Sequence, residues 1–270
     1  MLKYSIKDDM FSHAFSSSGW HNPTFFEWDR VTQHGDILFF TDTSVVCAPQ
    51  IPSLKKYAWL IESPVVTPHA YQFVKDNPTI FDKIFTHSNE ILELPNSHLV
   101  PIGGCLIDDI DISVNHGKTK LISMMYSFKR FAPGHELRYQ IVNRYSDFID
   151  IMGSGKTGVT VKKINSCKDY AFSIAIENCK KDYYFTEKII DCFLTGTVPI
   201  YWGCPSIGKF FNLDGFFTFD TIDDLHKIIG DQNMLMDFYG EKSDILLENY
   251  ERALKYKIAE DYLYLNYIKN

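Results

Sequence analysis

The sequence lacks the features that place a protein in a membrane or build it around structural zinc. Its longest apolar runs, such as Ile37–Phe40 and Tyr57–Ile61, fall far short of the roughly 20 residues that a membrane-spanning helix needs. The six cysteines form no Cys-x-x-Cys pair, and no histidines stand at zinc-finger spacing. The opening MLKYSIKDDM lacks the apolar stretch of a signal peptide. We therefore expect a cytoplasmic protein with free thiols and no integral membrane segment.

The chain also lacks an excess of basic residues. It has 27 Lys and Arg against 34 Asp and Glu, for a formal net charge of −7. This balance argues against a broad nucleic-acid surface but is compatible with a local basic pocket. With 270 residues, 45% of them apolar, the chain can bury a substantial core in one large or two small domains.

Several catalytic motifs are incomplete or missing. The run GSGKTG resembles a phosphate-binding loop, but the position five residues before Gly155 holds Asp150 where that motif needs glycine. No G-x-S-x-G elbow is present. Asp109 and Asp111 imitate the D-x-D of metal-dependent glycosyltransferases, yet they lie in an acidic run that we interpret as a solvated loop. No ligand set for a divalent metal is visible, although a metal stays an open question.

Short apolar runs alternate with helical patterns along the chain, which predicts α/β domains with parallel sheets. In the first half we expect strands at 2–6, 36–40, 57–61, 83–86 and 98–102, and helices near 68 and at 90–94. In the second half we expect strands at 121–127, 148–152, 170–176, 197–202 and 215–219, and helices at 135–145, 187–194 and 241–268. The polar stretch 108–118 is the best linker. The sequence thus predicts two Rossmann-like domains, 1–115 and 116–270, facing a central cleft.

The most informative segment is Tyr170–Ser206. It is predicted to run as a strand, a polar loop, a helix with Thr186 as N-cap and Gly196 just past its end, and a second strand. Ligands bind at the carboxyl edge of such sheets, and the N-terminus of a helix suits a phosphate. This pattern indicates a site for a nucleotide or another phosphate ligand.

Two features of this segment allow more than one interpretation. Lys188 lies in the first turn of the helix, against the dipole preference, which makes sense beside an anion. A solvated surface lysine is the alternative. Glu177 and Asn178 follow the strand directly, at a ligand position, but asparagine is also typical of ordinary turns.

The stretches SIAIEN and YYFTEKIIDCFLTGTVPIYWG resemble the donor-binding motif of glycosyltransferase family 10, the α-1,3-fucosyltransferases, and are closer to its bacterial members. Two further places are similar. Glu62 stands in WLIESPVVTP, where family members carry a glutamate after a strand of the N-terminal domain. Arg138 stands in APGHELRYQIVNRY, in a helix that follows a strand, and Lys129 and Arg130 are its nearby competitors.

The resemblance implies a GT-B-like fold and an inverting transfer of L-fucose from GDP-fucose to a glycan hydroxyl. By this resemblance Glu62 is the general base, while Arg138 and Lys188 clamp the donor diphosphate together with the Thr186 helix end. Inversion needs such a base and such a stabilised leaving group. The remaining donor contacts implied are Glu187 on the ribose, Asn178 and Tyr184. His135 either lines this site or simply begins a helix.

The same resemblance implies a nucleotide sugar and a glycan acceptor as partners, with no cofactor or metal required by the motifs. Peripheral membrane association, the acceptor and the linkage stay open. Two alternatives also stay open: a glycosyltransferase that uses another nucleotide sugar, and a non-catalytic nucleotide- or glycan-binding module of the same fold.

Overall fold

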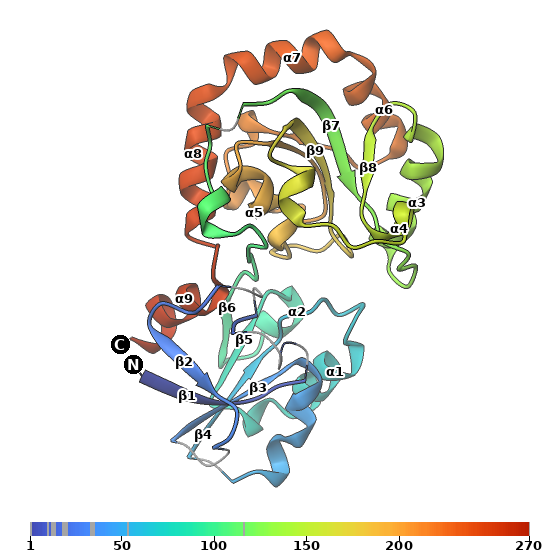
Figure 1. The fold of residues 1–270 in the computed structure, drawn as a ribbon. Coiled ribbons are helices and arrows are strands. Elements are labelled where there is room, and N and C mark those ends of the chain that lie inside the picture. The colour runs from blue at the N-terminus through green and yellow to red at the C-terminus, as the bar shows by residue number, and fades with distance from the viewer. Residues whose placement is uncertain are drawn as a thin grey trace. The chain divides into compact units, whose positions relative to one another are not determined.

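The computed structural model describes residues 2–9, 11, 15–17, 21–32, 36–52, 54–115 and 117–269. The chain forms two compact units. The first comprises Met1–Gly104, Lys181–Tyr184 and Tyr256–Asn270, and the second comprises Cys105–Lys180 and Phe185–Lys255 (Figure 1). His116, where the sequence placed the start of the second domain, lies outside the described residues.

The first unit is built on a parallel sheet whose described strands follow the order β2-β1-β3-β4-β5-β6. These strands are β1 Leu2–Lys7, β2 Phe26–Asp29, β3 Ile37–Thr41, β4 Lys55–Trp59, β5 Lys83–Thr86 and β6 Ser97–Leu99. Both faces of the sheet are buried, as is usual for parallel sheets. The strands therefore read as continuous apolar runs, such as ILFF in β3.

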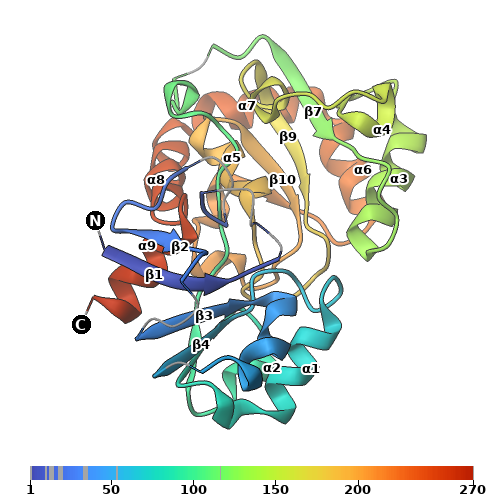
Figure 2. The same cartoon turned by 60° about the horizontal axis from the view of Figure 1, so that its bottom comes forward.

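Helices cover the two faces of the first sheet. Because successive side chains of a strand point to opposite faces, Phe39 of β3 belongs to one core and Phe40 to the other. Helix α1 (Pro68–Asp76) packs on the Phe40 side, and α9 (Ala259–Leu263) packs on the Phe39 side (Figure 2). The remaining helical segments of this unit are a 3₁₀ segment at Asp42–Gln50, one at Pro78–Ile80, α2 Asn89–Leu92 and a π-helical turn at Tyr264–Ile268.

The second unit is built on another parallel sheet, in the described order β11-β10-β9-β7-β8. Its strands are β7 Lys120–Met125, β8 Asp150–Met152, β9 Tyr170–Ile176, β10 Val198–Trp202 and β11 Phe217–Thr218. Its α-helices are α3 Pro133–Tyr145, α4 Ser154–Thr157, α5 Glu187–Leu194, α6 Ile222–Gly230, α7 Gln232–Glu241 and α8 Ser243–Leu254; its 3₁₀ segments are Asp109–Asp111, Lys163–Ser166, Ile207–Lys209 and Leu213–Gly215. All residues of the central strand β9 are buried.

Two sequence expectations need correction. The continuous helix expected at 241–268 is wrong: α8 ends at Leu254, and α9 begins at Ala259. The chain turns between these helices because Ala259 and Leu263 of α9 are buried in the core of the first sheet. Residues 256–270 therefore belong to the first unit, although the sequence placed them in the second domain.

A close backbone approach secures this return. The amide of Gly104 donates to the Tyr256 carbonyl, with nitrogen and oxygen 2.8 Å apart. Gly103 has φ +53°, and a Cβ there would lie 2.3 Å from the same carbonyl oxygen. Glycine is required at this position both for its backbone conformation and for its lack of a side chain.

Candidate functional site

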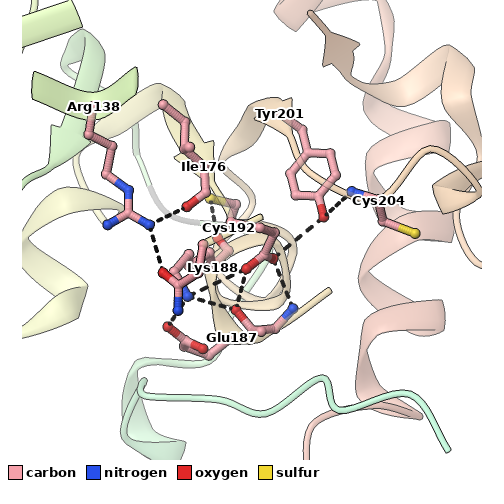
Figure 3. Close-up of polar contacts among 10 residues, drawn as sticks. Arg138, Ile176, Glu187, Lys188, Cys192, Tyr201 and Cys204 are labelled. Carbon is pink, nitrogen blue, oxygen red and sulfur yellow. Dashed lines mark hydrogen bonds and ion pairs between the residues drawn. The ribbon is translucent and has the colours of Figure 1, made fainter. Parts of the chain in front are cut away.

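The second unit gathers polar side chains around Glu177, directly after the end of β9. The Glu177 side chain has no solvent exposure, and its carboxylate accepts from several donors. Figure 3 shows the polar contacts of this region, with Arg138, Lys188 and Tyr201 among the labelled residues. Oε1 accepts from the Thr186 amide at 2.9 Å and from the Tyr201 hydroxyl at 3.4 Å. Oε2 accepts from the Thr186 hydroxyl at 2.8 Å and lies 3.4 Å from Nζ of Lys188. Glu177 thus ties the end of β9 to the start of α5 and to β10.

Two glycines make room for this arrangement. A Cβ on Gly203 would lie 2.5 Å from Cγ of Glu177 and 2.6 Å from the Tyr201 hydroxyl oxygen. A Cβ on Gly134, at the start of α3, would lie 1.7 Å from the Glu177 carbonyl oxygen. The Gly134 amide instead donates to the Asn178 carbonyl at 2.9 Å. The N-terminus of α3 therefore packs directly on the carboxyl end of β9.

Thr186 stands at the predicted N-cap of α5, but its side chain does not cap the helix. Its hydroxyl donates to Glu177 and accepts from Nζ of Lys188 at 2.9 Å. The hydroxyl oxygen, which would accept from a backbone amide in a side-chain cap, accepts from the Lys188 ammonium instead. Gly196, with φ +64°, lies just past the C-cap Thr195, in the left-handed conformation expected of a residue that ends a helix.

Lys188 has anionic partners within its own chain. Its ammonium lies 3.0 Å from Oε1 of Glu187, in addition to its contact with Glu177. Burial lowers the pKa of Lys188, but Glu187 and Glu177 more than offset this, and the net pKa lies above the ordinary lysine value. Burial raises the pKa of Glu177, with Lys188 acting in the opposite direction. The interpretation of Lys188 as a solvated surface lysine is therefore wrong.

Arg138 joins the same cluster from α3. It is buried, with 8% of its surface exposed, and one guanidinium nitrogen donates to the Ile176 carbonyl at 2.8 Å and to Oδ1 of Asn178 at 3.1 Å. Its competitor Arg130 is exposed, pairs with Glu136 at 2.7 Å and lies over the Tyr139 ring. Of these two arginines, the structure brings Arg138 to the end of β9.

His135 is a further member that sequence patterns left undecided. It is 3% exposed at the start of α3, and its Nδ1 has no hydrogen-bond partner among the described residues. Burial, together with the nearby charges of Arg138, Lys129 and Lys188, lowers the pKa of His135 to about 4. The ring is therefore neutral at physiological pH, next to several cations.

The structure does not place the other predicted residues in this cluster. Tyr184 is counted with the first unit, where it is buried with its ring centroid 4.8 Å from that of His87. Glu62 also belongs to the first unit and follows β4. It is half-buried, its amide donates to Asp42, and its carbonyl accepts from the Tyr71 hydroxyl. The neighbouring Phe185 is buried against Phe210 and Phe211.

The motifs set aside in the sequence have ordinary structural roles. The Gly-rich run forms the four-residue helix α4, whose Gly155 amide donates to the Tyr126 carbonyl at 3.0 Å. Asp109 and Asp111 form a 3₁₀ turn. Across the described ranges, no cluster of three or more His, Cys, Asp or Glu side chains could hold a metal ion. None of the helices described here has the length and apolarity to span a bilayer.

Comparison with known proteins gives this cluster a context. Residues 115–241, which contain all its members, match the family model described as "Glycosyltransferase family 10 (fucosyltransferase) C-term". The Alpha-(1,3)-fucosyltransferase FucT of Helicobacter pylori is 30% identical over 128 residues, which are 46% of this chain and 27% of that protein. The chain thus spans little more than a quarter of the length of this relative.

Solved structures are similar over most of the chain. An alpha1,3-fucosyltransferase with GDP-fucose shows a TM-score of 0.54 at 19% identity, covering 94% of this chain and 90% of that one. HepE of Anabaena in complex with UDP-glucose shows a TM-score of 0.57 at 10% identity, covering 87% and 78%. Together with the two parallel sheets, these likenesses confirm the predicted GT-B-like α/β fold. The family match confirms the predicted resemblance to fucosyltransferases.

Proposed function

We propose that this protein is a fucosyltransferase of glycosyltransferase family 10, the family whose C-terminal model its residues 115–241 match. The observation that carries the proposal is a coincidence of two facts. The matched region contains a cluster of Arg138, Asn178, Glu187 and Lys188 at the carboxyl end of β9, held in place by the buried Glu177. This is the position in an α/β sheet where nucleotides bind.

The cluster is suited to a diphosphate. Arg138 and Lys188 supply two positive charges, and the start of α5 adds the positive end of a helix dipole. As the bond between the sugar and the diphosphate breaks, negative charge grows on the diphosphate oxygens. Donors that are already fixed in place stabilise this charge without reorganising during the reaction.

In this proposal, donor binding replaces the ion pair between Lys188 and Glu187 with one between Lys188 and the diphosphate. Glu187 and Lys188 keep 28% and 20% of their side chains exposed, whereas Glu177 is fully buried. A diphosphate competes with Glu187 for the ammonium, and the released Glu187 carboxylate accepts from ribose hydroxyls. Glu177 cannot turn outward and keeps its contact with Thr186 and Lys188.

Glu62 serves as the general base in the proposed mechanism. Its carboxylate takes the proton of an acceptor hydroxyl while that oxygen forms a bond to C1 of the fucose. The bond from C1 to the diphosphate oxygen breaks in the same step, and its electron pair leaves with GDP. This single displacement inverts the configuration at C1. The acceptor is a glycan, bound by the first unit, and the donor binds to the second.

Arg138, Lys188 and the start of α5 can stabilise the charge of the leaving group, so we propose a metal-independent reaction. Transfer should persist in the presence of EDTA. Loss of transfer in EDTA, with recovery on adding Mg²⁺ or Mn²⁺, would contradict this part of the proposal and leave the donor assignment intact.

A panel of nucleotide sugars tests the function. The purified protein is incubated with GDP-fucose, GDP-mannose or UDP-glucose, with and without glycan acceptors, and nucleotide release is measured. We expect acceptor-dependent release of GDP from GDP-fucose. Release from a different donor alone would refute the fucose assignment. Donor binding without release from any member of the panel would favour a non-catalytic binding module.

A further inference from the structure

The first unit contains a buried carboxylate, Asp42, in an unusual backbone conformation. Asp42 follows β3 directly, its side chain has no solvent exposure, and its φ is +40°. Within the described part of the chain, Tyr183 is the other non-glycine residue with positive φ. Side chains rarely adopt this conformation, because Cβ then approaches the following carbonyl oxygen. An aspartate held here points to a side chain with a specific task.

The side chain of Asp42 binds two consecutive backbone amides, those of Ile61 and Glu62. Oδ1 accepts from the Ile61 amide at 2.9 Å and from the Glu62 amide at 3.1 Å. Strands β3 and β4 are neighbours, with Thr41 opposite Trp59, so the two chain segments leave the same edge of the sheet. Asp42 therefore fixes the path of the chain between the end of β4 and Glu62.

The charge of Asp42 is costly at this site. Its Oδ2 is buried and has no hydrogen-bond partner among the described residues. The pKa of Asp42 is raised to about 7: burial is the largest cause, the charges of Glu62 and Asp8 add to it, and the amides of Ile61 and Glu62 act in the opposite direction.

A second side chain, that of Tyr71, binds the backbone carbonyl of Glu62. The Tyr71 hydroxyl, from α1, donates to the Glu62 carbonyl at 2.6 Å. Its oxygen lies 3.0 Å from Nε2 of His87, just after β5. Because the phenol has one proton and donates it to Glu62, Nε2 of His87 must be the donor of the second bond. Burial lowers the pKa of His87 to about 4, so this ring is neutral at physiological pH.

We propose that Asp42 and Tyr71 are positioning residues that orient Glu62 for proton transfer by holding its amide and its carbonyl. The inference rests on the proposed function, in which Glu62 is the base. The backbone of Glu62 is held by side chains from two different elements, which fixes the point from which its carboxylate projects. Misplacement of a catalytic group by about 1 Å can cost on the order of 10²-fold in rate.

We call the bonds of Asp42 and Tyr71 to the Glu62 backbone the clamp. The substitutions Asp42→Gly and Asp42→Asn separate the effect of losing the clamp from the effect of the backbone conformation of residue 42. Glycine accepts the positive φ but removes the oxygen that binds the two amides, and we expect kcat to fall by about 10²-fold. Asparagine accepts the positive φ and keeps an oxygen for the amides, and we expect kcat to be largely rescued. KM for GDP-fucose and GDP affinity should change in neither variant. An unchanged kcat in Asp42→Gly would overturn the proposal.

Asp82→Gly is the matched control. The Asp82 carboxylate is exposed and accepts from the Lys56 amide at 2.8 Å, at the opposite end of β4. The substitution Asp82→Gly thus removes a similar hydrogen bond to the backbone of β4, away from Glu62, and should leave kcat unchanged. Tyr71→Phe provides an independent variant should Asp42→Gly fail to fold; it removes the bond to the Glu62 carbonyl and should also lower kcat with KM unchanged. If kcat is unchanged in Tyr71→Phe, the clamp is not needed.

A double-mutant cycle with Glu62→Gln distinguishes positioning from a structural effect. If Asp42 acts through Glu62, Asp42→Gly should cause little further loss of residual transfer in the Glu62→Gln background. Losses that multiply would overturn the proposal, because Asp42 would then act independently of Glu62. Failure of the proposed function itself would look different, since the unaltered protein would release no nucleotide from any donor.

Discussion

The ammonium of Lys188 lies 3.4 Å from Oε2 of Glu177, and the two groups differ in their access to solvent. The glutamate side chain is fully buried, while the lysine keeps 20% of its side chain exposed. Glu177 is therefore an inner anchor, and Lys188 is the cation that a ligand can reach. The Thr186 hydroxyl between them donates to the first and accepts from the second.

Replacing Glu177 tests this anchor. Glu177→Gln keeps the shape but removes the charge and turns an amide N–H₂ toward groups that are themselves donors. A buried donor without an acceptor costs about 1–3 kcal/mol, so we expect the free energy of unfolding to fall by that amount. GDP affinity should fall as well, because Lys188 loses its fixed position. Denaturant unfolding and GDP titration measure the two effects.

Glu90→Gln is the control for this change. Glu90 pairs with Lys75 at 2.8 Å on the surface of the first unit. Surface pairs of this kind contribute about 0–1 kcal/mol, so this variant should remain close to the unaltered protein. Equal destabilisation by both substitutions would contradict the role of Glu177 as a buried anchor.

Arg138 should not tolerate lysine. Its guanidinium bridges the Ile176 carbonyl and Oδ1 of Asn178, and a lysine ammonium lacks the planar array of donors needed to do this and also bind a diphosphate. We expect Arg138→Lys to lower kcat/KM for GDP-fucose by about 10²-fold. Arg130→Lys, at the exposed site beside Glu136, should have little effect. The reverse order of the two variants in steady-state kinetics would assign the diphosphate contact to Arg130.

Gly203 should be intolerant of a single added methyl group. In Gly203→Ala the new Cβ lies 2.5 Å from Cγ of Glu177, so the anchor must move. Overpacking of this kind costs about 1–3 kcal/mol, and we expect weaker GDP binding with it. In Gly230→Ala nothing lies within 4 Å of the new methyl, and the residue is in α6, so stability should stay the same or rise. Thermal unfolding with and without GDP compares the two.

His135 predicts a pH dependence of stability. Its pKa is about 4 in the folded protein and about 6.5 when unfolded, so the unfolded chain binds the proton more readily. The stabilising contribution is complete above pH 6.5 and is lost as the pH falls toward 4. His135→Gln should flatten this part of the stability curve, whereas the exposed His69→Gln should not. A curve for His135→Gln that overlays the unaltered protein would contradict the prediction.

The local pattern of the sequence predicted the strand and the helix at the centre of the site. It did not predict the buried side chains that hold them in place. The seven-residue, mostly apolar run of β9 and the amphipathic run after Thr186 predicted both elements with the bounds that the structure has. The buried role of Glu177 was not predictable, because its partners Thr186 and Tyr201 come together only through the order β10-β9 of the sheet. The same holds for Asp42, whose positive φ and bonds to 61 and 62 depend on the pairing of β3 with β4.

In the C-terminal segment, a clear helical pattern led to a wrong prediction. Leu247, Leu254 and Ile258 follow a helical spacing, which predicted one long helix. The chain leaves that helix after Leu254 because burial of Ala259 and Leu263 on the first sheet outweighs local propensity. Periodicity alone cannot indicate on which of two sheets a residue packs.

The central claim is that the cluster around Lys188 binds the diphosphate of GDP-fucose and that the protein transfers the sugar. The most direct test is acceptor-dependent GDP release from GDP-fucose by the unaltered protein, Lys188→Gln and Lys227→Gln, whose lysine is exposed on α6. The account predicts release by the unaltered protein and by Lys227→Gln, and a loss of about 10²-fold in Lys188→Gln. Equal release by all three proteins, or none from GDP-fucose by the unaltered one, would contradict it.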